Sequence, residues 1–206
     1  MRILVACEYS GRVRDAFIRR GHDAMSCDIL PSDIPGPHYQ GDVRDVLGDG
    51  WDLVIAFPPC TDLSLAGAVH WKAKQADGRQ QAAAEFFMAM INAPAAHVAV
   101  ENPRGIMTKL CRPPDQVVEP WWFGDPYAKK TCLWLKGLPL LEADNIVTPV
   151  GRVATGGGSW RTDKASGKTA MSAYEDSEGR KNRAKVRSRT FPGVARAMAA
   201  QWTNVL

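Results

Sequence analysis

Hydrophobic residues along the chain alternate between two patterns. Short apolar runs at residues 3–6, 53–57 and 97–100 have the length and composition of strands that are buried on both faces. Between them, residues 12–20 and 80–92 carry apolar side chains at intervals of three and four positions, which is typical of helices that pack one face on a sheet. Strands that alternate with helices predict βαβ units and a parallel sheet with right-handed crossovers.

Four other segments complete the predicted domain. Residues 23–29 and 131–135 have the composition of strands, and weak strand signals continue to about Val150. A terminal helix is expected near Pro192, because proline is favoured in a first helical turn, and its apolar face should pack on the first strand–helix unit. Residues 65–75 show no clear period, so we expect a mobile loop there.

The composition sets bounds on this picture. The 206 residues, 45% hydrophobic and 23% charged, fit one ordinary globular domain. Five cysteines, an odd number without a Cys-x-x-Cys pair, argue against a disulfide framework and against a zinc site. The sequence shows no signal peptide and no membrane-spanning run, so we expect a cytoplasmic monomer that binds neither a membrane nor a metal.

Positive charge is unevenly placed. The net charge of +4 permits a polyanionic partner without requiring one, but residues 151–189 hold ten Lys or Arg against four Asp or Glu. Trp160 and Tyr174 lie in this segment and could stack on bases. The segment predicts either a small nucleic-acid recognition insert or a solvated loop. We therefore expect a catalytic domain at 1–150, the basic insert at 151–189 and a closing helix at 190–206.

A cysteine stands at the end of the central apolar run. Pro58 and Pro59 end that strand, because proline has no N–H for the ladder, and Cys60 follows directly. A free cysteine is often only a small buried hydrophobic residue. The next apolar strand, however, ends in Glu101 and Asn102, and the carboxyl ends of parallel strands meet at the edge where ligands bind. A thiol and a carboxyl group in one cleft could attack a ring carbon and hydrogen-bond the ring nitrogen.

The turn after the first strand lies where nucleotide-type cofactors dock on such sheets. It is not a Gly-x-Gly-x-x-Gly loop, since only Ser10 and Gly11 are small, and a cofactor without a pyrophosphate, such as S-adenosylmethionine, needs a less close backbone approach. Asp28 follows the second strand and could accept hydrogen bonds from a ribose, or it could be a solvated loop acid. Asp42 could accept from an adenine amino group, cap a short helix, or do both.

At this point the chain resembles the catalytic domain of the DNA (cytosine-5) methyltransferases, in the short form typical of bacteriophage genomes. The Phe57-Pro-Pro-Cys60 stretch with Ser64 resembles the Pro-Cys nucleophile loop of that family. The Glu101-Asn-Pro sequence resembles its Glu-Asn-Val motif, with proline in place of valine. The match runs in motif order over roughly residues 1–140 and again over the terminal helix. It implies an α/β fold, a Rossmann-like S-adenosylmethionine-dependent methyltransferase sheet with helices on both faces.

The resemblance also implies roles for individual residues. The catalytic residues would be Cys60, Glu101 and Asn102, with Asn102 fixing the Pro58–Cys60 loop rather than touching the substrate. S-adenosylmethionine, or a modified analogue, would be bound by Glu8, Tyr9, Ser10, Gly11, Asp28, Ile29, Asp42, Val43 and Pro58. DNA would be contacted by Ser64, Arg79, Lys129, Thr131, Arg187 and Arg189.

Three departures from the family pattern leave the identity of the substrate undecided. The first loop has lost most of its glycines. In the stretch that resembles the family's Gln-x-Arg-x-Arg segment, glutamine is replaced by Tyr127 and the two arginines by Lys129 and Thr131. The large target-recognition domain that usually precedes the terminal helix is missing, so only residues 151–189 remain for that task.

Three hypotheses follow from these observations. The first is a DNA cytosine-5 methyltransferase that works through a covalent Cys60 adduct, and the second is the same chemistry on a free deoxycytidine nucleotide or with a modified cofactor. The third is a non-catalytic, methyltransferase-like DNA-binding module. Amino-methyltransferases carry an Asn/Asp-Pro-Pro-aromatic loop instead, and a cysteine in the aromatic position together with Glu101 favours methylation of carbon.

Overall fold

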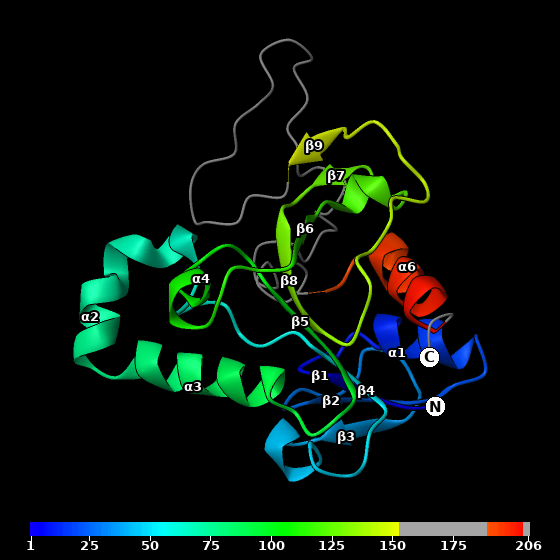
Figure 1. Ribbon diagram of the computed structural model, residues 1–206, viewed down its shortest axis with the longest axis horizontal. Coiled ribbons are helices and arrows are strands. Elements are labelled where there is room, and N and C mark those ends of the chain that lie inside the picture. The colour runs from blue at the N-terminus through cyan, green and yellow to red at the C-terminus, as the bar shows by residue number, and fades with distance from the viewer. Residues whose placement is uncertain (153–188, 204–206) are drawn as a thin grey trace.

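The computed structural model describes residues 1–152 and 189–203, so Arg187 and most of the predicted basic insert lie outside the described residues. A seven-stranded sheet with the order β3-β2-β1-β4-β5-β8-β6 forms the centre of the molecule (Figure 1). Its strands are β1 (Arg2–Ala6), β2 (Asp23–Asp28), β3 (His38–Gln40), β4 (Leu53–Ala56), β5 (His97–Asn102), β6 (Gln116–Val118) and β8 (Thr131–Lys136).

Helices and short turns connect these strands. The helices are α1 (Arg12–Ile18), α2 (Trp71–Ala76), α3 (Arg79–Ile91), α4 (Met107–Leu110) and α6 (Pro192–Trp202). Three 3-10 turns are η1 (Val43–Asp45), η2 (Leu65–His70) and η3 (Pro120–Trp122). A separate two-stranded sheet pairs β7 (Tyr127–Ala128) with β9 (Gly151–Arg152) in parallel.

The strands β3, β2, β1, β4 and β5 run parallel, as the alternation of strands and helices predicts. β8 lies between β5 and β6 and is antiparallel to both, an orientation that the apolar pattern of Thr131–Lys136 does not reveal. The chain winds outward from β1 toward β3 and then in the opposite direction through β4 and β5. This reversal makes a topological switch point between β1 and β4, and ligands of open α/β sheets bind outside the carboxyl ends of the strands there.

Helices cover both faces of the sheet, which confirms the predicted α/β, Rossmann-like fold class. On one face α1 and α6 lie side by side, and Phe17 and Trp202 are fully buried there. On the other face α3 buries Phe87, whose ring meets the edge of the Trp134 ring at 5.1 Å between centroids. The contact between α1 and α6 confirms that the terminal helix packs on the first strand–helix unit.

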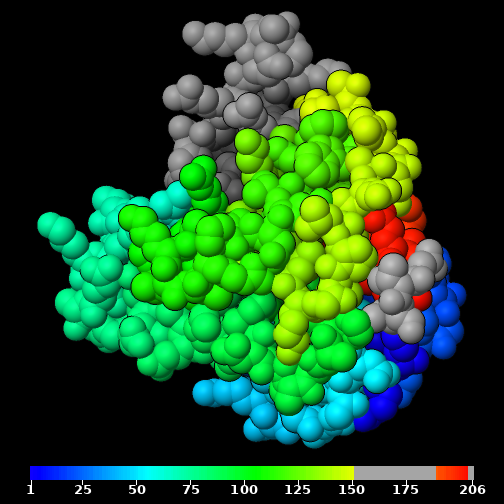
Figure 2. Space-filling model, viewed as in Figure 1, coloured from blue at the N-terminus to red at the C-terminus, as the bar shows by residue number. Residues whose placement is uncertain are grey.

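Residues 137–150 form an extended strap and not the weak strands expected from the sequence. Backbone groups of the strap bond to several elements: Trp202 Nε1 of α6 donates to Pro139 O (3.0 Å), Leu141 N donates to Gln116 Oε1 of β6 (2.8 Å), and Val147 N donates to Trp121 O of η3 (2.9 Å). Figure 2 shows the strap in yellow against the red surface of α6. Side chains and loop carbonyl groups of several elements thus take the place of a neighbouring strand, which a local apolar pattern cannot indicate.

Residues 65–75 are also more ordered than the predicted mobile loop, because they form η2 and most of α2. The buried face of α2 is carried by Lys74, a residue type that gives no apolar signal. Within residues 1–152 and 189–203, no helix has the length and apolar character needed to cross a membrane. In the same part of the chain, His, Cys, Asp and Glu side chains form no cluster of three that could hold a metal ion.

Candidate active site

Cys60 lies in a tight turn at the carboxyl end of β4, next to the switch point of the sheet. The two prolines end the strand, and Cys60 O accepts hydrogen bonds from the backbone N–H groups of Leu63 (3.1 Å) and Ser64 (2.9 Å). Pro58 is buried, whereas Cys60 is half-exposed. The turn therefore presents a thiol on a backbone that is fixed on both sides. Residues 60–64 are called the cysteine loop below.

The adjacent strand β5 is joined to the cysteine loop. Buried Asn102 donates from Nδ2 to Pro58 O at 2.8 Å, which is the loop contact expected from the sequence. Two backbone hydrogen bonds continue the connection, from Leu65 N to Arg104 O (3.0 Å) and from Ile106 N to Leu63 O (2.8 Å). The segments that carry Cys60 and Glu101 thus form one rigid unit at the edge of the sheet.

Gly105 permits this close approach, and its replacement gives a first prediction. A Cβ at position 105 would lie 2.1 Å from Leu63 O, so Gly105→Ala must push the two segments apart. We expect a loss of about 1–3 kcal/mol in unfolding free energy, as for other overpacked sites, measured by thermal or denaturant unfolding. Gly48→Ala is the matched control, because a Cβ there meets nothing within 4 Å. Equal stability of the two variants would contradict the contact.

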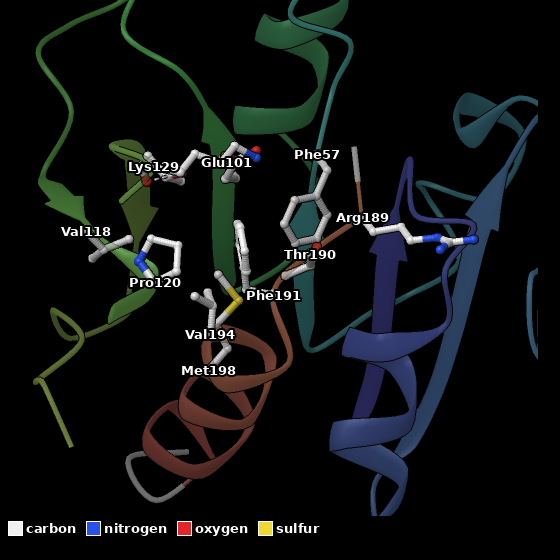
Figure 3. A pocket seen from close by; sticks show the side chains of 11 residues that line it. Phe57, Glu101, Val118, Pro120, Lys129, Arg189, Thr190, Phe191, Val194 and Met198 are labelled. Atoms are coloured by element: carbon white, nitrogen blue, oxygen red, sulfur yellow. Dashed lines mark hydrogen bonds between the residues drawn. The ribbon is translucent and has the colours of Figure 1, made fainter. Parts of the chain in front are cut away.

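Glu101 lies in a pocket between the carboxyl edge of the sheet and the start of α6 (Figure 3). The polar lining includes Lys129, Thr131 and Arg189, all predicted site residues, and the apolar lining includes Phe57 and Phe191. The cavity volume is about 30 Å³, which is room for about two water molecules. Of the described residues, Cys60 and the turn after β1 are not part of this lining. A nucleobase would therefore require the pocket to open.

Burial raises the pKa of Glu101 above its usual value, because the carboxylate is removed from water. The Lys129 ammonium and a hydrogen bond with the Thr131 side chain oppose this effect and favour the charged form. Lys129 Nζ also lies 5.7 Å from the centre of the Phe191 ring. Desolvation is the largest of these influences, so Glu101 holds its proton more tightly than an exposed glutamate.

The turn after β1 is held together by the carboxylate of Glu8, which is one of its own residues. Glu8 is only 4% exposed, and it accepts hydrogen bonds from the Ser10 hydroxyl and from Gly11 N (3.1 Å). Cys7 has a φ of 57°, in the left-handed region that normally favours glycine. Glu8, Tyr9 and Ser10, all predicted to bind the cofactor, are buried in the turn. Glu8 and Ser10 hydrogen-bond within it, so these two side chains shape the turn.

Carboxylates surround the neighbouring strand ends. Asp28 is half-buried, burial raises its pKa, and its Oδ1 accepts from Leu30 N at 2.9 Å. Asp42 caps η1 by accepting from Arg44 N at 2.9 Å, as one of the sequence alternatives proposed, and the Arg44 side chain lowers its pKa to about 2. Burial raises the pKa of the Cys7 thiol, and the charges of Asp28 and Asp42 raise it further, so both acids act on the same end of the sheet.

Asp28 and Asp42, called the acidic edge below, are the residues of this region that could hold a cofactor. Both carboxylates could accept hydrogen bonds from hydroxyl or amino groups of a ligand, and Asp28, which among the described residues has no arginine partner like the Arg44 of Asp42, would favour a nearby positive charge. Ile29 is 75% exposed beside Asp28, and Val43 is buried beside Asp42. Hydrogen-bond acceptors next to an exposed apolar side chain fit the ribose and base of an adenosine, and S-adenosylmethionine adds a sulfonium cation.

The residues predicted to contact DNA are distributed over different parts of the molecule. Ser64 is buried in the cysteine loop, and exposed Arg79 pairs with Asp77 at 2.6 Å. Arg189 pairs with Asp33 at 2.8 Å and lines the Glu101 pocket. Arg189 is thus occupied by a carboxylate, so a phosphate contact would require this ion pair to open.

Several supporting residues were not found from the sequence. Arg14 is fully buried and donates to Ser32 Oγ (3.2 Å) and Pro35 O (3.0 Å), which holds the proline-rich loop after β2. Asp125 Oδ2 accepts from Gly193 N at 2.7 Å and so caps the first turn of α6. Neither residue carries a sequence signal, because an arginine or aspartate of this kind is indistinguishable from a solvated one until the fold brings its partners close.

No family model matches the chain, and no curated protein sequence matches it either. Among solved structures, it is similar to a prophage-encoded DNA modification methyltransferase of E. coli, with a TM-score of 0.48 and 17% identity over 72% of this chain and 52% of the other. It is also similar to a mutant of DNMT2 from Spodoptera frugiperda, with a TM-score of 0.42 and 16% identity over 76% of this chain and 56% of the other. The chain spans about half the length of these structures, and likenesses this distant carry no argument about activity.

Proposed function

We propose that this protein is an S-adenosylmethionine-dependent DNA methyltransferase that modifies C5 of cytosine through a covalent bond to Cys60. One observation carries the proposal. The hydrogen bond from Asn102 to Pro58 O ties the cysteine loop to the strand that carries Glu101, next to the switch point of the sheet. A nucleophile and a half-buried acid on one rigid unit are the two groups that this chemistry requires.

Cys60 would act as the nucleophile. C5 of cytosine does not react readily with an electrophile, but addition of the Cys60 thiolate to C6 makes C5 part of an enamine. C5 would then take up the methyl group as the bond between that methyl and the sulfonium sulfur breaks, which leaves a neutral thioether. The C5 proton would pass to solvent, and elimination of the Cys60 thiolate from C6 would restore the aromatic ring. The fixed turn around Cys60 supports this role, because attack at C6 requires the sulfur at a defined position.

Glu101 would stabilise the ring while the bond to sulfur forms. Electron density moves from C6 to N3 during the attack, and a carboxylic acid can donate a hydrogen bond or a proton to that nitrogen. The raised pKa of Glu101 favours the protonated form that makes this possible. Thr131 and Lys129 would orient the carboxyl group. Asn102 would act indirectly, by holding Pro58.

The cofactor would lie along the acidic edge. Asp28 would accept hydrogen bonds from the ribose hydroxyl groups, and Asp42 would accept from the adenine amino group, with Ile29 and Val43 beside the base. Glu8, Ser10 and Gly11 would hold the turn beneath it. When bound, S-adenosylmethionine supplies an activated methyl group. This assignment rests on the carboxylates around the ends of β1 and β2.

A cytosine stacked in a duplex could not reach Cys60, so the base would be flipped out of the helix. Arg79, Lys129, Arg187 and Arg189 are the proposed phosphate or base contacts. The small volume of the Glu101 pocket implies that DNA binding enlarges it. The Arg189–Asp33 ion pair at the pocket wall is the contact that would have to separate.

Nucleoside mass spectrometry of DNA incubated with the protein and S-adenosylmethionine tests this proposal. New 5-methylcytosine supports it. A modified base other than cytosine, or modification of an exocyclic nitrogen, overturns the C5 chemistry. Modification of free deoxycytidine nucleotides without modification of DNA would favour the nucleotide alternative, and DNA binding without modification of DNA or of nucleotides would favour the non-catalytic module.

A further inference from the structure

Lys74 in α2 is a buried lysine directly beneath the cysteine loop. The residue is 7% exposed, and its Nζ donates to Thr61 O at 2.6 Å. The same ammonium lies 3.0 Å from a carboxylate oxygen of Asp62. Lysine is almost never buried unless it is paired, so both contacts are needed to hold it there. A helix that looks polar in sequence thus directs its one buried side chain at the loop that carries the thiol.

The surroundings of the ammonium are shaped to receive it. A Cβ on Gly67 would lie 3.3 Å from Lys74 Nζ and 3.3 Å from Thr61 O, so the glycine leaves room at the contact. Buried Gln80, at the start of α3, donates to Asp62 O at 3.1 Å and adds a second support to the same loop. The cysteine loop is therefore held by α2 and α3 together.

Cys60 lies between two fixed carbonyl groups. On one side Asn102 holds Pro58 O at 2.8 Å, and on the other side Lys74 holds Thr61 O at 2.6 Å. The first anchor belongs to β5 and the second to α2, so two independent elements determine where the backbone of Cys60 runs. Removal of Lys74 would free Thr61 O, the anchored carbonyl nearest to Cys60 on this side, and leave the rest of the loop held by Gln80 and by the backbone bonds to residues 104 and 106.

We propose that Lys74 is a positioning residue that fixes Cys60 in its reactive position. This role deepens the proposed function and rests on it as far as catalysis is concerned, but the anchoring itself does not depend on the reaction. A displacement of the reacting atoms by about 1 Å can lower a rate by about 100-fold. Loss of Lys74 should therefore slow the chemical step and leave cofactor affinity unchanged, because the carboxylates of the acidic edge are on other elements.

The anchoring is tested by the reactivity of Cys60 toward iodoacetamide, followed by peptide mass spectrometry in the full-length protein. Lys74→Met keeps the length of the side chain and removes the ammonium, and we expect it to increase the alkylation rate of Cys60 severalfold. Lys72→Met is the matched control, because Lys72 is exposed two residues earlier in the same helix. Equal Cys60 alkylation rates in wild type and both variants would overturn the proposal.

The catalytic consequence is tested by single-turnover methyl transfer with saturating DNA and S-adenosylmethionine. Lys74→Met should lower the rate by about 100-fold, with an unchanged dissociation constant for S-adenosylmethionine in calorimetry. Lys74→Arg, which can still donate to both Thr61 O and Asp62, should recover part of the rate. A weaker cofactor affinity with an unchanged transfer rate would overturn the positioning role. If the wild-type protein transfers nothing to DNA or to nucleotides, the proposed function fails, and the alkylation rates still decide the anchoring.

A measurement on the unchanged protein covers the case in which Lys74→Met does not fold. Acetic anhydride modifies exposed amines, and we expect Lys72 to be acetylated readily while Lys74 is protected until the protein is denatured. Equal acetylation of both lysines in the native protein would show that Lys74 is not held at Thr61, and this result would also overturn the proposal.

Discussion

Replacement of Cys60 with alanine is expected to abolish methyl transfer, with a loss of at least about 10⁴-fold, as for the removal of other covalent nucleophiles. Without the bond from sulfur to C6, C5 has no enamine character and does not attack the methyl group. DNA that contains 5-fluorocytosine should trap the wild-type protein, because fluorine cannot leave C5 as a cation and elimination of Cys60 is blocked. The measurement is a denaturing gel shift of the protein–DNA adduct.

Cys111→Ala serves as the control for this experiment, since Cys111, like Cys60, is half-exposed and lies outside the strands of the described sheet. It should form the adduct as the wild type does. An adduct that persists in Cys60→Ala would assign the nucleophile to another residue. Transfer by the wild type without any trapped adduct would indicate methylation of an exocyclic nitrogen instead.

Glu101→Gln is expected to lower the transfer rate by about 10²–10⁴-fold, the usual range for loss of a general acid. Its effect on stability should depend on pH. Burial raises the pKa of Glu101 in the folded protein above its value in the unfolded chain. The folded state therefore gains from the bound proton below the unfolded pKa, and this gain is lost as the pH rises through the folded pKa.

Glutamine cannot ionise, so Glu101→Gln should not share this loss. Thermal unfolding of both proteins between pH 4.5 and pH 8 tests the sign: the difference in Tm, variant minus wild type, should grow with pH. Glu85→Gln is the control, because Glu85 is exposed on α3 and its replacement should give a difference that does not change with pH. A difference for Glu101→Gln that shrinks with pH would show that Lys129 and Thr131 outweigh desolvation.

The positions of Cys60 and Glu101 could be predicted from the short sequence patterns around them. Prolines that end a strand and a carboxylate at the end of the next strand predict the same sheet edge, and the structure places Cys60 and Glu101 there. The contact between Asn102 and the cysteine loop could also be predicted, because the side chain of a buried asparagine usually hydrogen-bonds to nearby backbone groups. The sequence could not indicate Gly105, since a close approach of two backbones depends on the spacing of β4 and β5 in three dimensions.

Other features were hidden because identical residue types can face water or the interior. Lys74 has the same local sequence character as Lys72, yet one is buried against the cysteine loop and the other is exposed. Glu8 was predicted to bind the cofactor, and the sequence did not indicate that its carboxylate accepts hydrogen bonds from Ser10 and Gly11 within the turn. Hydrophobic periodicity predicts which face of a helix or strand is apolar. It does not predict that a polar side chain is buried by a hydrogen bond or ion pair with another element.

The two ends of the segment between Arg152 and Arg189 are both fastened to the body of the molecule. β9 pairs with β7 at one end, and the Arg189–Asp33 ion pair holds the other end against the loop after β2. The body therefore fixes both attachment points of the segment. Because both points belong to the body, an exchange of the residues between them would leave the β7–β9 pairing and the Arg189–Asp33 ion pair in place, so this positively charged part of the sequence can vary while the sheet and its contacts stay the same.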